Sequence, residues 1–179
     1  MSILAMPITS PTVSIETFRE VMSRWGTGVT VISAAYDGQR HGMVASSFTS
    51  VSADPFTVLF CADHRTRTYA AVKASGAFAV NILSQDQEGT FQVFAGRTSR
   101  TSDQDADKFI DQDTLLAATG SPILNDSLAW FDCRVVAEYP GGNTHTIFVG
   151  EVIAADLGAG LDQPPLLYFN RQLRSIQSE

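Results

Sequence analysis

Residues 41–52 read HGMVASSFTSVS, and five of the seven residues from Ser46 to Ser52 carry a hydroxyl group. Valine, phenylalanine and threonine are typical of an extended strand, yet strict alternation leaves this strand without a clean apolar face. On an edge strand such hydroxyl groups face water, whereas on the wall of a groove they contact a ligand. The residues alone leave both interpretations open.

The segments around this stretch have the pattern of short strands separated by turns. Runs rich in Val, Ile and Phe occupy residues 28–35, 41–52, 56–62, 77–83, 128–139, 145–156 and 166–169. Their lengths and spacing favour antiparallel strands joined by hairpins over βαβ units with long crossovers. Many short strands with a few helices predict an α+β or mainly β barrel.

Three segments carry helical signals. Ser14 is a good N-cap for a helix whose apolar positions run from Ile15 to Trp25, and Gly26 is its predicted stop. Two further helices are predicted over residues 68–75 and 85–95, the first of them ending at a glycine.

Length and composition indicate one compact domain. A chain of 179 residues with 44% apolar and 17% charged residues buries a sizeable core, and its length favours one domain over two. No repeat or linker marks a boundary, so we expect a flexible N-terminus at residues 1–12 and a single domain over 13–179. The polar, poorly periodic residues 96–107 predict a mobile loop.

The charge balance argues against one class of function, and the sequence pattern argues against export or membrane insertion. A net charge of -7 and a pI near 4.8 argue against nucleic-acid binding, which needs clustered cations. The first residues contain two prolines and no cationic region, so no signal peptide is expected, and no apolar run approaches the ~20 residues that cross a bilayer. Cys61 and Cys133 are expected to be free thiols of a cytoplasmic protein.

Familiar catalytic motifs are missing from the sequence. It contains no HExxH, CxxC, GxxxxGK or GxSxG pattern. His41, His64 and His145 lie far apart and lack carboxylates at the spacing of a metal site, so we expect no metal site. Metal catalysis and acid–base hydrolysis therefore lose support.

Arginines interleaved with hydroxyl groups point to an anion instead. Arg65 and Arg67 lie in ADHRTRT, while Arg97 and Arg100 lie in GRTSR. Phosphate groups favour this mixture of guanidinium and hydroxyl donors, although solvated loops have the same composition. ADHRTRT follows a strand and starts a helix, which favours an anion at the helix N-terminus. Beside it, the hydroxyl groups of residues 41–52 suit the phosphate and sugar-alcohol chain of a cofactor.

Seven segments in the same order resemble one known family. They are GTGVTVIS (26–33), HGMVASSFTSVSADP (41–55), LFCADHRTRT (59–68), SGAFAVNILSQDQ (75–87), KF (108–109), GxxHTIFVGEV (142–152) and PLLYF (165–169). Together they resemble the short-chain flavin reductases, the reductase partners of two-component flavin-dependent monooxygenases. The resemblance implies an FMN-binding split β-barrel with a few flanking helices, a homodimer, FMN or FAD as the flavin, NADH or NADPH as hydride donor, and an oxygenase that receives reduced flavin.

The resemblance also implies where the flavin is held. Along the ring and its ribityl chain it places Val44, Ala45, Ser46 and Ser47, with the backbone of Cys61, Ala62 and Asp63 nearby. Near the phosphate it places Ser50, Ser52, Arg65, Thr66 and Thr68. Asn81 would order the flavin-side strand, and Phe94, Arg97 and Arg100 are candidates for an adenine end if the flavin is FAD.

His145 is the side chain that the resemblance connects with the reaction. In the family a histidine after a glycine turn faces the nicotinamide side of the flavin, whereas a histidine that starts a strand is often only structural. Many relatives have Gly-Asp-His where this chain has Gly142-Asn143-Thr144-His145, so an acid is lost beside it. Relatives of similar fold leave two alternatives, a flavin- or haem-binding protein without turnover and a reductase of a cobalt corrinoid.

Overall fold

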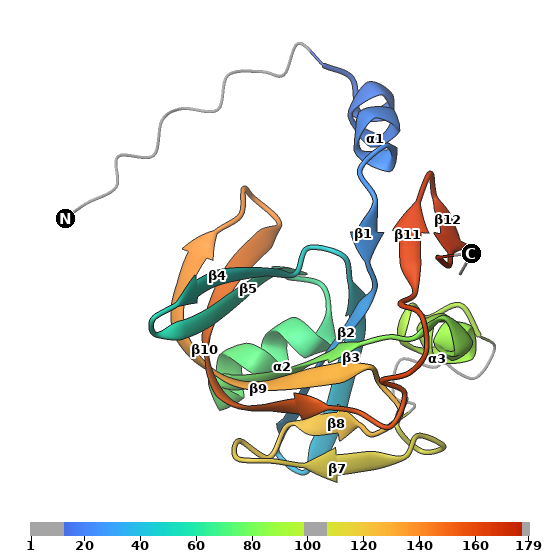
Figure 1. Cartoon of the computed structure of the whole chain (residues 1–179). Coiled ribbons are helices and arrows are strands. Elements are labelled where there is room, and N and C mark those ends of the chain that lie inside the picture. Colours follow the sequence, from blue (N-terminus) through green and yellow to red (C-terminus); the bar gives the residue numbers. More distant parts are fainter. Residues whose placement is uncertain (1–12, 99–106, 177–179) are drawn as a thin grey trace.

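The structure is a computed structural model that describes residues 13–98 and 107–176, and those residues are mostly antiparallel β structure with three α-helices (Figure 1). The predicted N-terminal segment 1–12 lies outside the described residues, as does most of the predicted loop 96–107.

A seven-stranded sheet forms the body of the molecule, in the order β3-β2-β6-β9-β10-β5-β4. Its strands are β2 (Thr30–Tyr36), β3 (Gln39–Ala45), β4 (Thr49–Ala53), β5 (Phe56–Asp63), β6 (Ala77–Ile82), β9 (Ala129–Pro140) and β10 (His145–Leu157). Every neighbouring pair is antiparallel, which confirms the predicted hairpin arrangement.

Residues 41–52 do not form the single strand that their composition predicted. β3 ends at Ala45, which pairs with Thr30, and β4 begins at Thr49, which pairs with Leu59. The residues between them turn a corner, where the Ser47 hydroxyl accepts from Cys61 N at 3.1 Å and donates to Cys61 O at 3.3 Å. The Ser47 side chain thus forms hydrogen bonds to backbone groups that a continuing strand would pair with its own backbone. The strand prediction did not take this competition between side chain and backbone into account.

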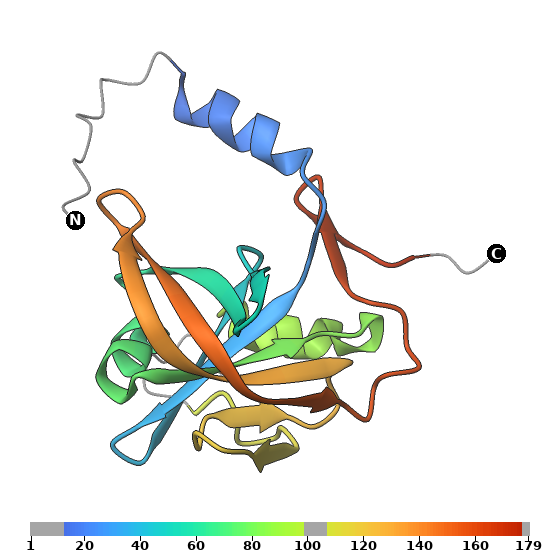
Figure 2. The ribbon, with the colours of Figure 1, turned by 60° about the vertical axis from the view of Figure 1, so that its left-hand side comes forward.

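This corner makes the sheet curl on itself. β3 and β4 stand at opposite ends of the strand order, yet only Ser46, Ser47 and Phe48 separate them in the chain. The two outer strands are therefore brought close at one end, and the sheet bends into the incompletely closed barrel of Figure 2. The result is the split β-barrel that the resemblance implied.

Two apolar clusters stabilise the fold. Inside the curled sheet, Phe60 stacks on Phe148 with ring centroids 5.4 Å apart and meets the Phe78 ring edge-on at 4.8 Å. The second cluster lies outside β2 and β3 and contains Phe91, Phe94 and Phe109. Losing one such buried ring typically costs about 3–5 kcal/mol, so both clusters contribute substantially to stability.

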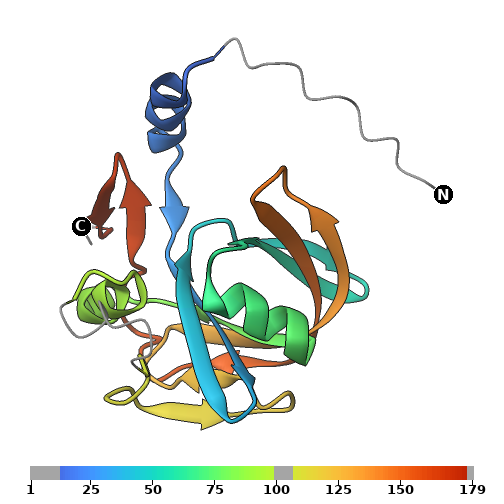
Figure 3. The same ribbon diagram turned by 180° about the vertical axis from the view of Figure 1, so that it is seen from behind.

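The helices lie near their predicted positions. They are α1 (Ile15–Ser23), α2 (Arg67–Ser75), the 3-10 turn η1 (Gln85–Gln87) and α3 (Glu88–Phe94). The Ser14 side chain caps α1 as predicted, but α1 ends at Ser23 instead of continuing to Gly26. α2 ends at Gly76 in a left-handed conformation, φ 68°, and packs against the sheet (Figure 3).

The remaining strands are short, and the sequence patterns missed most of them. β1 (Thr27–Gly28), β11 (Leu167–Phe169) and β12 (Gln172–Arg174) form a small sheet, while β7 (Thr114–Leu116) pairs with β8 (Pro122–Leu124). β7, β8 and β12 have three residues each, too few for a visible alternation. The turn before β12 uses positive φ angles at Asn170 and Arg171, without the glycine that usually signals it.

α1 stands apart from the barrel (Figure 2). Its attachments are at its C-terminal half: Asn170 N donates to Ser23 O at 2.8 Å, and Arg171 pairs with Glu20 at 3.2 Å. None of the helices in the described ranges has the length and apolar composition needed to cross a bilayer.

Candidate functional site

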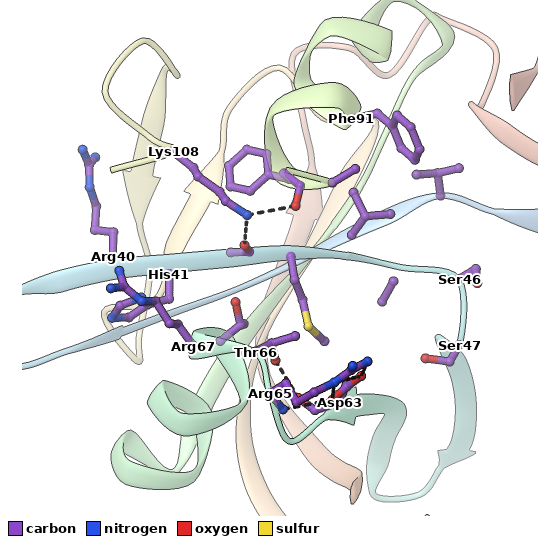
Figure 4. A pocket seen from close by; sticks show the side chains of 18 of the residues that line it. Arg40, His41, Ser46, Ser47, Asp63, Arg65, Thr66, Arg67, Phe91 and Lys108 are labelled. Carbon is purple, nitrogen blue, oxygen red and sulfur yellow. Dashed lines mark hydrogen bonds and ion pairs between the residues drawn. The ribbon is translucent and has the colours of Figure 1, made fainter. Parts of the chain in front are cut away.

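A cavity of about 1160 Å³ runs along the outer edge of β3. That edge has no strand partner among the described residues, since β3 is the last strand of its sheet. Residues from β3, β5, β10, α2, α3 and β11 line the cavity, so segments from most of the chain meet there (Figure 4). The volume exceeds the range of about 300–1,000 Å³ that is usual for small-molecule sites.

The apolar wall of the cavity consists of Val29, Val44, Phe91, Phe94, Ala95 and Tyr168, all members of or packed on the second apolar cluster. Gly42 makes this wall possible, because a Cβ there would lie 2.5 Å from the Phe94 ring. The resulting surface offers flat aromatic and aliphatic contacts beside the backbone edge of β3.

The polar wall faces it and consists of Ser47, Cys61, Asp63, Arg65, Thr66, Thr68 and His145. The Asp63 carboxylate accepts from Arg65 N at 2.9 Å and pairs with the Arg65 guanidinium at 2.6 Å. These hydrogen bonds from Arg65 hold the pKa of Asp63 well below its usual range. The Arg65 side chain is nonetheless 87% exposed, so its remaining donors are open to a ligand.

The N-terminus of α2 lies beside this ion pair. The Thr66 side chain caps the helix by accepting from Tyr69 N at 3.2 Å, and it donates to Asp63 O at 2.8 Å. The first backbone N–H groups of a helix and its dipole favour an anion. Arg65 and the start of α2 therefore form a coherent anion-binding corner of the cavity.

His145 begins β10 directly across the ladder from Asp63, so the two side chains share one face of the sheet. Its Nδ1 lies 2.9 Å from the Thr144 hydroxyl, and its carbonyl accepts from Gly141 N at 2.9 Å. A Cβ on Gly141 would lie 3.2 Å from the His145 Cβ, so the glycine leaves the ring room. Thr144 therefore orients the imidazole that lines the cavity.

The cavity is cationic in an acidic protein. Arg40, Arg65, Arg67, Arg97 and Lys108 line it, five of the twelve Lys and Arg residues in the chain. Among the described residues that line it, the carboxylates are Asp63 and Asp107, two of the nineteen Asp and Glu residues. This local excess of positive charge favours an anionic ligand.

The structure brings most of the predicted cofactor-binding residues together. The predicted site residues that line the cavity are Val44, Ala45, Ser46, Ser47, Cys61, Asp63, Arg65, Thr66, Thr68, Phe94, Arg97 and His145. Arg97 also lies over the Phe91 ring, with its guanidinium carbon 5.2 Å from the centroid.

Four predicted residues lie elsewhere, and Arg100 is outside the described residues. Ser50 and Ser52 are on β4 beyond the corner, and the Ser52 hydroxyl bonds the backbone of Asp54. Ala62 is fully buried in the barrel core. The buried Asn81 carboxamide donates to Val31 O and accepts from Leu124 N, contacts that account for it structurally.

The sequence predictions missed several lining residues, among them Arg40, His41, Phe91, Lys108 and Tyr168. Lys108 and Tyr168 lie in the segments KF and PLLYF, which carried part of the resemblance without an assigned role. Arg40 and His41 follow the turn into β3, where charged residues ordinarily face solvent. No local signal distinguishes that arrangement from a binding wall.

Comparisons with known proteins agree with this geometry. The fold is a curled antiparallel sheet, and the cationic cavity along its free edge suits a phosphorylated small molecule. The family model described as "Flavin reductase like domain" matches residues 22–177. The chain therefore belongs to the flavin reductase-like family.

Two curated relatives are reductase subunits of monooxygenases. The Rhodococcus jostii flavin-dependent monooxygenase reductase subunit HsaB is 36% identical over 162 residues, covering 90% of this chain and 78% of the relative. The reductase component of the Rhodococcus opacus 4-nitrophenol 4-monooxygenase/4-nitrocatechol 2-monooxygenase is 38% identical over 152 residues, covering 85% and 76%.

Solved structures show the same fold. Flavin reductase PheA2 superposes with a TM-score of 0.81 at 33% identity, covering 93% of this chain and 100% of PheA2. The Streptomyces globisporus NADH:FAD oxidoreductase SgcE6, solved with NAD and FAD fragments, gives 0.80 at 30% identity, covering 94% and 98%.

Proposed function

We propose that this protein is an NAD(P)H:flavin oxidoreductase that reduces FMN or FAD and supplies the reduced flavin to a partner monooxygenase. The observation that carries the proposal is the cationic cavity along the β3 edge of a flavin reductase-like chain. Relatives named as reductase components of monooxygenases support the same role and imply an oxygenase partner.

The lining residues fit a flavin nucleotide. The apolar wall suits the ring, the backbone edge from Val44 to Ser47 suits the polar ring edge and the ribityl chain, and the corner at Arg65 and Thr66 suits the phosphate. A bound flavin supplies the redox chemistry by accepting a hydride from reduced nicotinamide, so the protein needs no metal or covalent side chain. The protein's own contribution is to hold the flavin and nicotinamide rings in contact and to exclude water.

His145 is the side chain we assign to the nicotinamide side. It lines the cavity on the polar wall, and Thr144 orients its ring. From there the imidazole can donate a hydrogen bond to a carboxamide or balance charge near a reduced ring. Many relatives have an acid beside this histidine in the sequence. In this chain the acid across the ladder from His145 is Asp63.

A crossed assay tests the proposal. Purified protein is mixed with FMN or FAD and with NADH or NADPH, and nicotinamide oxidation is followed with and without air. Flavin-dependent oxidation in at least one combination supports the reductase. A flavin that binds but is not bleached by either nicotinamide, or no oxidation in all four combinations, overturns it.

We further propose a homodimer in which α1 packs on a second copy of this chain. Apolar side chains on or beside α1 are largely exposed: Ile15 56%, Phe18 60%, Val21 65%, Met22 49% and Trp25 69%. An isolated helix of nine residues is marginal in water, so α1 needs a partner surface. The same chain exposes apolar residues on its sheet, namely Val51, Phe56, Val136, Tyr139 and Ile153. Helix and sheet surfaces of two copies can therefore cover each other.

Light scattering after size exclusion tests the dimer. The wild-type chain is expected to elute at twice its monomer mass of 19.3 kDa, and Phe18→Glu, which keeps a good helix former, to shift it toward the monomer. Leu116→Glu is the control, since Leu116 is 68% exposed on β7, which lies at the opposite end of the molecule from α1 (Figure 1). A wild-type monomer at all concentrations would contradict the proposal.

The expected location of this enzyme is the cytoplasm. Cys61 and Cys133 are both free, as expected in a reducing compartment, and burial raises the pKa of the Cys133 thiol to about 12.

A further inference from the structure

The turn before β10 holds the backbone of Thr144 in place. The Thr144 carbonyl accepts from His64 N at 2.9 Å, and the carbonyl of the next residue, His145, accepts from Gly141 N at 2.9 Å. Both peptide groups that follow the Thr144 side chain are therefore bonded to neighbouring segments, although Thr144 itself is exposed. Its hydroxyl group, 2.9 Å from Nδ1 of His145, thus projects from an anchored backbone.

The Thr144 hydroxyl determines which ring nitrogen of His145 is left for a ligand. His145 is partly buried and lines the cavity, and its Nδ1 is already occupied by that hydroxyl, so Nε2 is the nitrogen that remains. In a neutral imidazole one nitrogen carries the proton and the other accepts, and the hydrogen bond at one nitrogen sets the state of the other. The direction of the bond at Nδ1 therefore decides whether Nε2 donates or accepts.

A hydroxyl group beside Nδ1 allows a state that a carboxylate would not. A carboxylate only accepts, so it requires a proton on Nδ1, and Nε2 then donates only when the ring is doubly protonated and charged. A threonine hydroxyl also donates, so it can leave Nδ1 without a proton and Nε2 with one on an uncharged ring. Thr144 thus makes a neutral Nε2 donor available at this position.

The charges around His145 favour the uncharged ring. Asp63 on β5 lies across the ladder and would favour a charged imidazolium, but its carboxylate is paired with Arg65 at 2.6 Å. Turn residues 141–144 carry no charge, and in the described ladder β9 places its first partner, Pro140, opposite the residue that follows His145. Five cationic side chains line the cavity that the ring faces, and they disfavour a further positive charge.

We propose that Thr144 is a positioning residue whose hydroxyl donates to Nδ1 of His145 and holds the ring as the neutral Nε2–H tautomer. This inference rests on the proposed function, in which His145 faces the nicotinamide. An Nε2–H group donates to the carboxamide oxygen, whereas an unprotonated Nε2 accepts from the carboxamide NH₂ group. The tautomer therefore selects which end of the carboxamide faces His145, and Thr144 acts without touching the nicotinamide.

Nitrogen-15 NMR of the full-length chain, labelled in its three histidines, reads the tautomer without turnover. Long-range nitrogen–proton correlations at mildly alkaline pH distinguish the Nε2–H, Nδ1–H and doubly protonated rings, and His145→Ala identifies the His145 signals. We expect the wild type to show His145 as the Nε2–H tautomer. An Nδ1–H ring or a doubly protonated ring in the wild type overturns the proposal.

Two substitutions of Thr144 separate its hydroxyl from its shape. Thr144→Val keeps the branched side chain without the hydroxyl, and should give a mixture of the two tautomers. The KM for the nicotinamide dinucleotide should rise about fivefold, the effect of one misdirected hydrogen bond, while flavin affinity changes less than about twofold. Thr144→Ser keeps the hydroxyl and should restore both the spectrum and the KM. A His145 spectrum that is the same in Thr144→Val as in the wild type overturns the proposal.

Thr146→Val is the matched control on the same strand. The Thr146 hydroxyl lies 3.0 Å from Nε2 of His64, a second threonine–histidine pair that does not line the cavity. This substitution should change the His64 signals and leave those of His145 as they are. Because the spectrum is recorded without substrate, a protein that shows the expected tautomers but oxidises no nicotinamide would reject the reductase and leave the Thr144 hydrogen bond established.

Discussion

The two walls of the cavity are built in different ways. Asp63, Arg65 and Thr66 of the polar wall lie within four consecutive residues, and their mutual hydrogen bonds shape that turn. The apolar wall takes Phe94 from α3 and Tyr168 from β11, which meet only through packing. Charge recognition is therefore encoded in a short segment, whereas the flat surface for a ring depends on the whole fold. Substitutions on the polar wall should therefore lower the reaction rate or ligand affinity, whereas substitutions on the apolar wall should lower stability.

The largest expected effect is on the polar wall, from His145→Ala. We expect the rate of hydride transfer to fall about 100-fold, the lower end for loss of a positioned proton-bearing group, because the substitution removes the imidazole from the nicotinamide side. Flavin affinity should change less than about threefold, since other residues hold the phosphate. Stopped-flow flavin reduction and equilibrium titration measure the two quantities.

His64→Ala is the matched control for that experiment. His64 precedes the same anion corner, but it bonds Thr146 at 3.0 Å and packs on the Tyr69 ring at 4.8 Å, without lining the cavity. It should lower stability with no selective effect on the reduction rate. An unchanged reduction rate in His145→Ala would show that His145 is structural as well.

Gly42→Ala tests the apolar wall, and its effect should appear first as lost stability. The added Cβ would lie 2.5 Å from the Phe94 ring and 3.0 Å from the Phe109 ring, so both must move in a packed cluster. Overpacking of this kind costs about 1–3 kcal/mol, which urea denaturation measures. Gly28→Ala is the control, because no atom lies within 4 Å of its added Cβ. Equal costs for the two substitutions would show that the wall is not tightly packed.

Arg65→Ala returns to the polar wall with a smaller effect on binding. FMN and FAD should bind about tenfold more weakly, while riboflavin, which lacks the phosphate, should bind as before. The loss is moderated because the free protein already pairs Arg65 with Asp63. Titration of the three flavins measures it, and equal losses for all three would remove the phosphate role. Asp63→Asn should act in the opposite direction by releasing the guanidinium.

The same difference between the walls explains what the sequence could predict. Strand spacing, helix caps and the ADHRTRT segment are local signals, and they predicted the antiparallel sheet, α2 and the anion corner at Arg65. The family resemblance, and no local pattern, predicted Ser47, Cys61 and His145. Phe91 and Tyr168 resemble ordinary core residues until the fold places them on a cavity. Asn81 is a different case, because the resemblance implied that it orders the flavin-side strand, and its buried side chain bonds the backbone of β2 and β8 away from the cavity.

The smallest expected effect concerns the two halves of residues 41–52. Ser47→Ala removes the hydroxyl that makes two hydrogen bonds to the Cys61 backbone, and should cost about 1 kcal/mol of stability in urea denaturation. Ser50→Ala, beyond the corner on the exposed part of β4, should stay within about 0.5 kcal/mol of the wild type. A similar cost for both would mean that the corner does not depend on the Ser47 hydroxyl. A selective cost for Ser47→Ala would show that this hydroxyl, which the resemblance placed at the cofactor, also joins the corner between β3 and β4 to β5. It would thereby position the backbone that lines the cavity.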